Sequence, residues 1–154
     1  TPKDIFEIAE GRAEGNVNAA REAFSQLGKA AADSVIHALD IIDGLVVIGG
    51  GLSGAAKYIV PAMKEQMRSR LSTFGGDHFP CLQSDVYDLN DTEELAEFLR
   101  DDSTLVKVPG TERSVRYRNS RKTGIAVSSI GTSTAVALGA YAFALNNLNN
   151  LSKS

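Results

Sequence analysis

The chain has 154 residues, of which 43% are hydrophobic and 23% are charged, and its formal net charge is −3. These values are typical of one globular domain, exclude a disordered tail, a collagen and a coiled coil, and give no general basic field for nucleic acid or acidic membranes. Its one cysteine, Cys81, excludes an internal disulfide framework and predicts a cytoplasmic protein.

Two helices are predicted at the beginning of the chain. Thr1-Pro2-Lys3-Asp4 is typical of a helix start, and Gly11 ends this short helix. A longer helix is predicted from about Glu14 to Leu39. Its apolar stripe recurs every three or four residues and comprises Val17, Ala20, Phe24, Leu27, Ala31, Val35, Ala38 and Ile42.

A buried strand and a third helix come next. Leu45–Ile48 is a continuous apolar run, which predicts a strand covered on both faces. Three glycines follow it directly. The helical pattern resumes at Ser53 and continues to Leu71, where Pro61 predicts either a kink or two short helices.

The middle of the chain is predicted to contain short elements. The glycine-containing segment 72–80 is expected to be a loop, and Asp91 is expected to cap a small helix. The last two of the expected strands are joined by four polar residues and are predicted to pair as a hairpin. The strands are expected at Val86-Tyr87, Leu105–Val108, Val115–Arg118 and Gly124–Val127.

The last predicted element is a helix from about Thr132 to Asn147. Its strongly apolar part is about a dozen residues long, whereas a membrane span needs about 20. We therefore expect a helix that is buried in the core. Neither a repeat nor a linker divides the sequence, so residues 1–154 are predicted to form a single lobe.

The strongest signal for chemistry is the glycine turn. A strand that runs into Gly49, Gly50 and Gly51 and then into a helix places bare backbone at the carboxyl end of a sheet, where a ligand can approach closely and helix N–H groups attract phosphate. The turn lacks the lysine of a Walker loop. With Gly54 it has the spacing of a dinucleotide fingerprint, but Phe74 stands where the acidic ribose partner is expected. From spacing alone, a nucleotide site and a plain strand-to-helix turn are equal alternatives.

Other polar residues give weaker signals. His78 and Cys81 have the spacing of half a metal site, but the sequence offers no second pair to complete a zinc site. The basic residues between Arg113 and Lys122 fit a phosphate patch or a solvated hairpin face, and the acidic net charge favours the solvated face. A hydrolase is not supported, because the aspartates near the strands lack a partner of known role: Asp40, Asp43, Asp85, Asp88 and Asp91.

The order of these elements resembles the C-terminal half of ROK-family proteins, which are bacterial sugar kinases and sugar-sensing repressors. The motifs that carry the resemblance are Asp4–Gly11, Leu45–Ser53 and Gly124–Gly131. It extends over residues 1–71 and 122–145, whereas residues 72–121 match no family pattern. The resemblance implies an α/β fold: the C-terminal lobe of an actin-like, or ribonuclease H-like, ATPase, with a mixed sheet flanked by helices.

The same resemblance implies an ATP- and Mg²⁺-dependent hexose kinase of the glucokinase type. Gly49, Gly50 and Gly51 would pass beside the ribose and adenine, and Leu52 and Ser53 would begin the helix that lines the same cleft. Gly131 and the helix after it would pack nearby as structural support. The implied partners are ATP, a hexose and a second copy of the chain, with no membrane, and with nucleic acid only for a repressor.

Several motifs of the family have no counterpart in this chain. Its phosphate loop, catalytic aspartate and zinc-binding segment are expected upstream of Thr1, and Ile42-Asp43-Gly44 stands where Asp-Pro-Glu is usual. We therefore expect no catalytic residue, no metal ligand and no kinase activity in the chain alone. Two alternatives stay open: a sugar-responsive repressor of the same family, and an unrelated α/β dinucleotide-binding domain.

Overall fold

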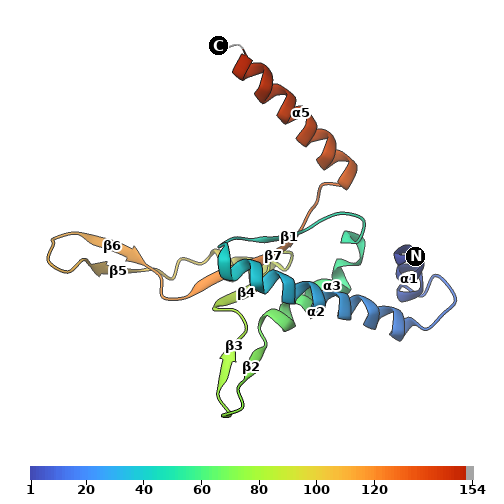
Figure 1. The fold of residues 1–154 in the computed structure, drawn as a ribbon, viewed down its shortest axis with the longest axis horizontal. Coiled ribbons are helices and arrows are strands. Elements are labelled where there is room, and N and C mark those ends of the chain that lie inside the picture. Colours follow the sequence, from blue (N-terminus) through green and yellow to red (C-terminus); the bar gives the residue numbers. More distant parts are fainter. Residues whose placement is uncertain (152–154) are drawn as a thin grey trace.

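The structure, a computed structural model, describes residues 1–151. Its helices are α1 (Pro2–Ala9), α2 (Val17–Ile41), η1 (Ser53–Ala55, a 3-10 turn), α3 (Ala56–Met67), α4 (Thr92–Leu99) and α5 (Thr132–Leu151). Its strands are β1 (Val46–Ile48), β2 (Arg70–Ser72), β3 (His78–Pro80), β4 (Ser84–Asp88), β5 (Thr104–Lys107), β6 (Ser114–Tyr117) and β7 (Arg121–Val127). Two hairpins and α5 project from a body made of the other elements (Figure 1).

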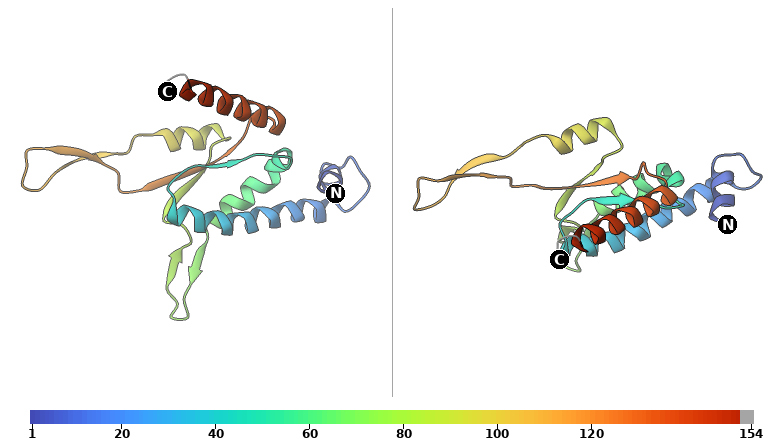
Figure 2. Two further views of the ribbon diagram at one scale, coloured as in Figure 1. Left: turned by 45° about the horizontal axis from the view of Figure 1, so that its top comes forward. Right: turned by 90° about the horizontal axis from the view of Figure 1, so that it is seen from above.

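The body is organised around a small parallel sheet with the strand order β1-β7-β4. In the central strand β7, Ile125 pairs with Val46 of β1 on one side and with Asp88 of β4 on the other. The antiparallel pairs are confined to the two hairpins, β2–β3 and β5–β6, which extend away from the body in Figure 2. The predicted α/β fold, with helices that flank the sheet, is confirmed.

The main core lies between one face of the sheet and the packed pair α2–α3. Side chains that alternate along a strand face opposite sides of the sheet. Val86 and Ile125 point toward the helices and are fully buried there. Met63 and Met67 of α3 fill the space between these strands and α2. Burial of this face is the main source of the stability of the lobe.

The buried line of α2 differs from the predicted stripe. Its buried residues recur every four positions and are Ala20, Phe24, Gly28, Ala32 and Ile36. Leu27 and Ala38 of the predicted stripe are exposed, and Ile42 lies beyond the helix end. The difference centres on Gly28, where a Cβ atom would lie 2.5 Å from the Ile59 carbonyl oxygen of α3. Two helices can approach this closely only where a small residue lies between them. The predicted stripe was built from apolar side chains and therefore left out Gly28.

Two local predictions are wrong, because the segments that lie opposite decide the local structure. The expected loop at 72–80 contains a hairpin, in which Leu71 pairs with Phe79 across a Gly75-Gly76 turn. β6 pairs with β5 and not with β7, because β7 is taken up by the parallel sheet. Pro61 lies inside a continuous α3, so of the two predicted outcomes the division into two short helices at Pro61 does not occur, and the helix continues with one hydrogen bond fewer.

The expected burial of the first strand on both faces is also wrong. Val46 and Ile48 pack against the α2–α3 core, but Val47 on the opposite face is 63% exposed. The helix α4 covers that face only at the β4 end, where the rings of Tyr87 and Phe98 are 5.9 Å apart. The second face of the sheet is therefore covered over β4 and open over β1.

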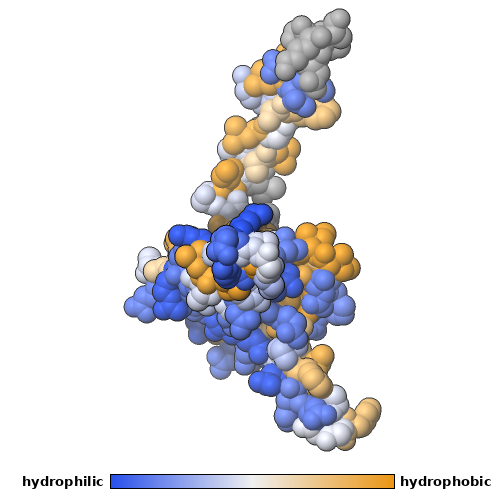
Figure 3. Space-filling model, turned by 90° about the vertical axis from the view of Figure 1, so that its left-hand side faces the viewer, coloured by the Kyte–Doolittle hydropathy of each residue, from blue (hydrophilic) through white to orange (hydrophobic). Residues whose placement is uncertain are grey.

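The last helix does not enter the core, contrary to the prediction. The helix α5, which begins at Thr132, extends away from the body (Figure 1), and those of its large apolar side chains that the structure describes are between 42% and 69% exposed. Figure 3 shows apolar side chains along the helix where it leaves the body. The predicted support of the glycine turn by this helix is therefore absent among the described side chains of α5. None of the described helices combines the length and hydropathy needed to cross a membrane.

The contact at Gly28 generates a stability prediction. We expect Gly28→Ala to lower the free energy of unfolding by about 1–3 kcal/mol, because the new methyl group forces α2 and α3 apart. Urea denaturation measures the change. Gly139→Ala is the control, since this helical glycine of α5 has open space around it and alanine favours the helix. Equal loss in both variants would contradict the prediction.

Candidate functional site

The glycine turn has a defined shape at the carboxyl edge of the sheet. Gly50 adopts φ +86°, a left-handed conformation that glycine takes without strain. Ser53 closes the turn, since its backbone N–H and its Oγ donate hydrogen bonds of 3.1 and 2.8 Å to the Gly50 carbonyl oxygen. The end of β7 lies beside it, where the Ser128 N–H donates to the Ile48 carbonyl oxygen at 2.8 Å.

The segment after the turn is not the start of a regular α-helix. Leu52 precedes the 3-10 turn η1, which begins at Ser53, and α3 begins only at Ala56. The Ser53 hydroxyl is already bonded to the turn. The predicted helix after the glycines is therefore present but starts three residues later, so its first turn lies farther from Gly49–Gly51 than the sequence predicts.

A cavity of about 330 Å³ lies beside the turn. One wall is formed by Gly51, Leu52, Gly54 and Ala55 of the turn and η1. The opposite wall is formed by α1 and α2 and comprises Pro2, Lys3, Phe6, Glu7 and Phe24. Bare backbone on one side and two aromatic rings on the other suit a flat heteroaromatic group, while Lys3 and Glu7 add charge to the lining.

Of the five residues predicted for the site, Gly51 and Leu52 line this cavity. Gly49, Gly50 and Ser53 shape the turn behind it. Sequence reasoning missed the wall contributed by α1 and Phe24. The only signal was the pair of aromatic residues at positions 6 and 24, and nothing in their spacing places them opposite a turn at position 51.

A run of aromatic rings holds α1 in place as the cavity wall. The ring of Phe6 contacts that of Phe24 edge-on, with centroids 6.3 Å apart. Phe24 in turn stacks on Tyr58 of α3 at 6.1 Å. These ring pairs join α1, α2 and α3. Each pair stabilises the fold by more than the burial of its apolar area alone would give. The position of α1 is therefore set by the α2–α3 pair.

Polar contacts hold the carboxyl end of α1 to α3. The Glu10 carboxylate accepts hydrogen bonds from Lys57 Nζ at 2.8 Å and from Tyr58 Oη at 2.7 Å. These two bonds, that from Lys57 first, lower the pKa of Glu10 below its ordinary value, so the carboxylate is ionised at neutral pH. Arg21 Nε donates to the Ala9 carbonyl oxygen at 3.0 Å, and the Tyr58 hydroxyl, whose one proton is directed mainly to Glu10, also lies 3.2 Å from that oxygen.

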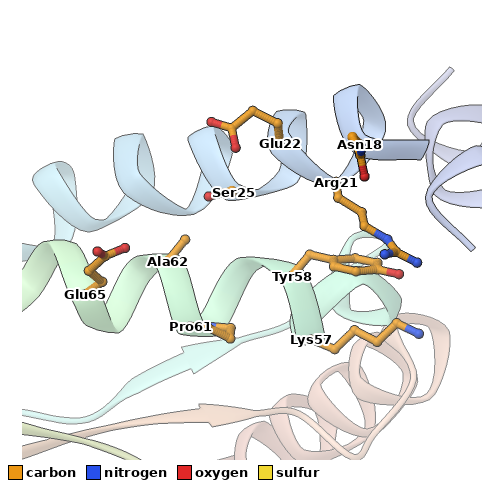
Figure 4. A pocket seen from close by; sticks show the side chains of 9 residues that line it. All are labelled: Asn18, Arg21, Glu22, Ser25, Lys57, Tyr58, Pro61, Ala62 and Glu65. Carbon is orange, nitrogen blue, oxygen red and sulfur yellow. The ribbon is translucent and has the colours of Figure 1, made fainter. Parts of the chain in front are cut away.

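A larger groove of about 520 Å³ runs between α2 and α3 (Figure 4). Its charged side chains are engaged with the protein itself. Arg21 lies over the ring of Tyr58, with 5.7 Å between its guanidinium carbon and the ring centroid, and Lys57 pairs with Glu10. These side chains therefore hold α1 in place. They leave few charged groups in the groove that are free to bind a ligand.

The other polar candidates are occupied by local contacts. The ring nitrogen Nδ1 of His78 is 2.8 Å from Ser72 Oγ, and Cys81 Sγ is 3.1 Å from Ser69 Oγ. Within residues 1–151, no group of three or more histidine, cysteine or acidic side chains gathers that could hold a metal ion.

The basic segment also forms local ion pairs. Arg116 lies 2.8 Å from Asp101, and Arg118 lies 2.7 Å from Asp102. The side chain of Lys122 is only 3% exposed, and its Nζ donates to main-chain carbonyl oxygens at the end of α4. Arg116 and Arg118 therefore belong to a mixed-charge surface, as the sequence interpretation of a solvated face predicts, whereas the buried Lys122 does not.

The comparison with solved structures finds a close likeness to a crystal structure of a glucokinase from Parabacteroides distasonis. The TM-score is 0.78 and the sequence identity 46%, over 95% of this chain. The chain spans only 39% of the length of that glucokinase. No protein-family model and no curated protein matches the chain.

The likeness confirms the predicted resemblance to a glucokinase and the actin-like ATPase fold that it implies. The short share of the glucokinase that is covered is consistent with the C-terminal half of such a protein. Because the match covers 95% of this chain, it also extends into residues 72–121, where the sequence alone shows no family pattern.

The contacts of Tyr58 generate a prediction about the cavity wall. We expect Tyr58→Phe to raise the hydrogen-exchange rate of the α1 amides about five-fold, the effect of losing one ordinary hydrogen bond, while the α2–α3 amides keep their protection. Mass spectrometry of exchanged peptides measures both. Tyr117→Phe, at an exposed tyrosine of β6, is the matched control. Unchanged exchange in α1 would show that Tyr58 does not hold this wall.

Proposed function

We propose that this chain is the ATP-binding lobe of a ROK-type sugar kinase, which phosphorylates a hexose such as glucose. The observation that carries the proposal is the cavity beside the glycine turn, in a chain that is 46% identical to a glucokinase over most of its length. The cytoplasmic location, the homodimer and the zinc site upstream of Thr1 belong to the same proposal.

The walls of the cavity fit an adenosine group. Gly51 lines the cavity without a side chain, so the nucleotide can approach the main chain there. The left-handed conformation of Gly50 turns the chain at the edge of the cavity. Phe6, Phe24 and Leu52 provide apolar surface for a purine ring. Mg²⁺ is ordinarily held together with nucleotide phosphates by one or two carboxylates, so it requires no dedicated cage in this lobe.

In this proposal the lobe positions the nucleotide and takes no direct part in the chemistry. Phosphoryl transfer depends mainly on the alignment of the two substrates and on neutralisation of charge. A rigid purine site fixes one end of ATP, so that the terminal phosphate reaches the sugar at a constant place. The base that accepts the proton of the sugar hydroxyl belongs to the remainder of the enzyme.

Nucleotide binding tests the cavity directly. We expect ATP to raise the melting temperature of residues 1–154, because a ligand that binds only the native state stabilises it, and NAD to have no comparable effect. Gly51→Leu is expected to weaken ATP binding at least about tenfold, since the new side chain enters the cavity. Isothermal calorimetry measures the affinity.

The control is Gly44→Leu. Gly44 also has open space where a Cβ atom would stand and ordinary backbone angles, but it does not line the cavity. Both variants should therefore fold, and only Gly51→Leu should lose affinity for ATP. A larger melting shift with NAD than with ATP would favour the dinucleotide-binding alternative. Equal ATP affinity in both variants would place the nucleotide elsewhere.

The proposal that this lobe contains no catalytic base gives a second test. We expect purified residues 1–154 to show no phosphorylation of glucose above background in a coupled assay for ADP, because the proposed role of this lobe includes no catalytic base. The glucokinase from Parabacteroides distasonis serves as the positive control. Glucose-dependent release of ADP by the chain alone would overturn this assignment.

A further inference from the structure

Two of the residues that line the cavity beside the glycine turn are charged. They are Lys3 and Glu7 of α1, whereas the rest of the lining is aromatic, aliphatic or bare backbone. Residues four apart lie on the same face of a helix, so both side chains come from one side of α1. A charged group in an apolar cavity limits which ligand fits, because the ligand must match its charge or its hydrogen bonds. The two residues therefore affect which base the cavity accepts.

The carboxylate of Glu7 is held at both oxygens by Arg12. The Nε of Arg12 donates to Glu7 Oε2 at 2.6 Å, and its Nη2 donates to Oε1 at 3.2 Å. Two parallel bonds of this kind fix the plane of a carboxylate as well as its position. The main chain adds two further bonds, since the N–H groups of Arg12 and Ala13 donate to the Glu7 carbonyl oxygen at 2.8 and 3.2 Å. Glu7 is therefore a fixed group in the wall of the cavity.

Arg12 is in turn fixed to the rest of the lobe. Gly11 adopts φ +72°, and this left-handed residue reverses the chain after α1, so that Arg12 lies back against the helix. The third guanidinium nitrogen, Nη1, donates to Glu10 at 3.3 Å, and Glu10 is bonded to α3. The guanidinium also lies over the ring of Phe6, with 5.4 Å between its central carbon and the ring centroid. Arg12 thus orients two residues of the cavity wall, Glu7 and Phe6, without lining the cavity itself.

Glu7 accepts hydrogen bonds and does not donate them at neutral pH. The hydrogen bond from Arg12 is the main cause that lowers the pKa of Glu7 below its ordinary value, so the side chain is ionised. The two oxygens of an ionised carboxylate have about four lone-pair sites between them. Arg12 uses two of these sites. The others are left to accept an N–H group of a ligand in the cavity.

We propose that Glu7 is a specificity-determining residue, which accepts a hydrogen bond from the 6-amino group of adenine and thereby selects ATP. The inference rests on the proposed function and gives α1 a role that the apolar rings do not supply, since they contact any purine alike. Adenine has an amino donor at position 6, whereas guanine and hypoxanthine have a carbonyl acceptor there. A carbonyl oxygen that faces the carboxylate lacks the hydrogen bond and is repelled by the negative charge. Arg12 is a positioning residue, because it acts through Glu7.

The other charged residue of the lining has the opposite preference. The ammonium group of Lys3 is a donor, which suits the 6-carbonyl oxygen of guanine or hypoxanthine. The structure favours Glu7, because Lys3 is exposed, whereas Glu7 is half-buried and held by two hydrogen bonds. A group that is already fixed loses less conformational entropy on binding than a freely moving lysine does. Selection by Glu7 therefore predicts a preference for adenine.

Comparison of ATP with inosine triphosphate tests the proposal, because the two nucleotides differ only at the N1–C6 edge of the base. We expect calorimetry of residues 1–154 to show that ATP binds at least about tenfold more tightly. In Glu7→Gln this ratio should fall to within about threefold, since an amide donates to the carbonyl as well as accepting from the amine. Glu14→Gln, at an exposed glutamate outside the cavity lining, is the matched control and should keep the parent ratio. An unchanged ratio in Glu7→Gln, or tighter binding of inosine triphosphate by the parent, would overturn the proposal.

Substitution of Arg12 tests the positioning role. Arg12→Met should reduce the ratio of the two affinities, although residue 12 does not line the cavity. Arg12→Lys should retain part of the ratio, because lysine keeps the charge but does not hold both carboxylate oxygens in one plane. A purely structural loosening of α1 would weaken both nucleotides alike. An unchanged ratio in Arg12→Met would therefore overturn the positioning role.

The outcome can be separated from that of the proposed function. ATP binding that Gly51→Leu weakens, with equal affinity of the parent for ATP and inosine triphosphate, would overturn this inference alone and leave the cavity as the nucleotide site. ATP binding that Gly51→Leu leaves unchanged would place the nucleotide elsewhere and overturn both. A ratio that falls in Glu7→Gln, together with weaker binding in Gly51→Leu, would support both.

Discussion

The close approach of α2 and α3 at Gly28 is the contact on which the other features depend. It is possible because position 28 has no side chain to separate α2 from the Ile59 carbonyl. The paired helices cover one face of the sheet and form the main core. They also carry Phe24 and Tyr58, the rings that hold α1 as a wall of the cavity. A change in the spacing of the two helices would therefore be transmitted to the candidate site without any contact with its ligand.

Helices cover the two faces of the sheet unequally. This difference explains why apolar side chains of β1 are exposed. The face toward α2 and α3 is closed. On the other face, α4 is fixed over β4 by the ion pair of Glu94 with Lys64 and by the hydrogen bond from the Asp88 N–H to Glu94. These bonds lower the pKa of Glu94, that from Lys64 most, and so keep it ionised. No comparable element covers β1 within residues 1–151, and α5 projects nearby with its apolar side chains exposed.

The candidate site depends on this arrangement of helices and sheet. Its two walls come from residues 2–24 and residues 51–55, and neither wall forms a cavity by itself. The turn supplies bare backbone and a fixed shape through Gly50 and Ser53. The helix α1 supplies aromatic surface, and its place is secured by Glu10, Lys57 and Tyr58. In the proposed function, this lobe binds and orients a nucleotide, and the chemistry requires groups from the rest of the enzyme.

Features that neighbouring residues along the chain decide could be predicted from the sequence. The capping box of Thr1 and Asp4, the cap of α4 at Asp91 and the glycine turn after β1 all follow from local hydrogen bonding and backbone freedom. The order of the elements, together with the motifs at Asp4–Gly11, Leu45–Ser53 and Gly124–Gly131, also indicated the resemblance to a family of sugar kinases and repressors. The buried line through Gly28, the partner of β6, the open face at Val47 and the wall formed by Phe6 were settled only when the chain folded. Each of these depends on which distant segment lies opposite, and periodicity along a chain carries no information about what packs against it.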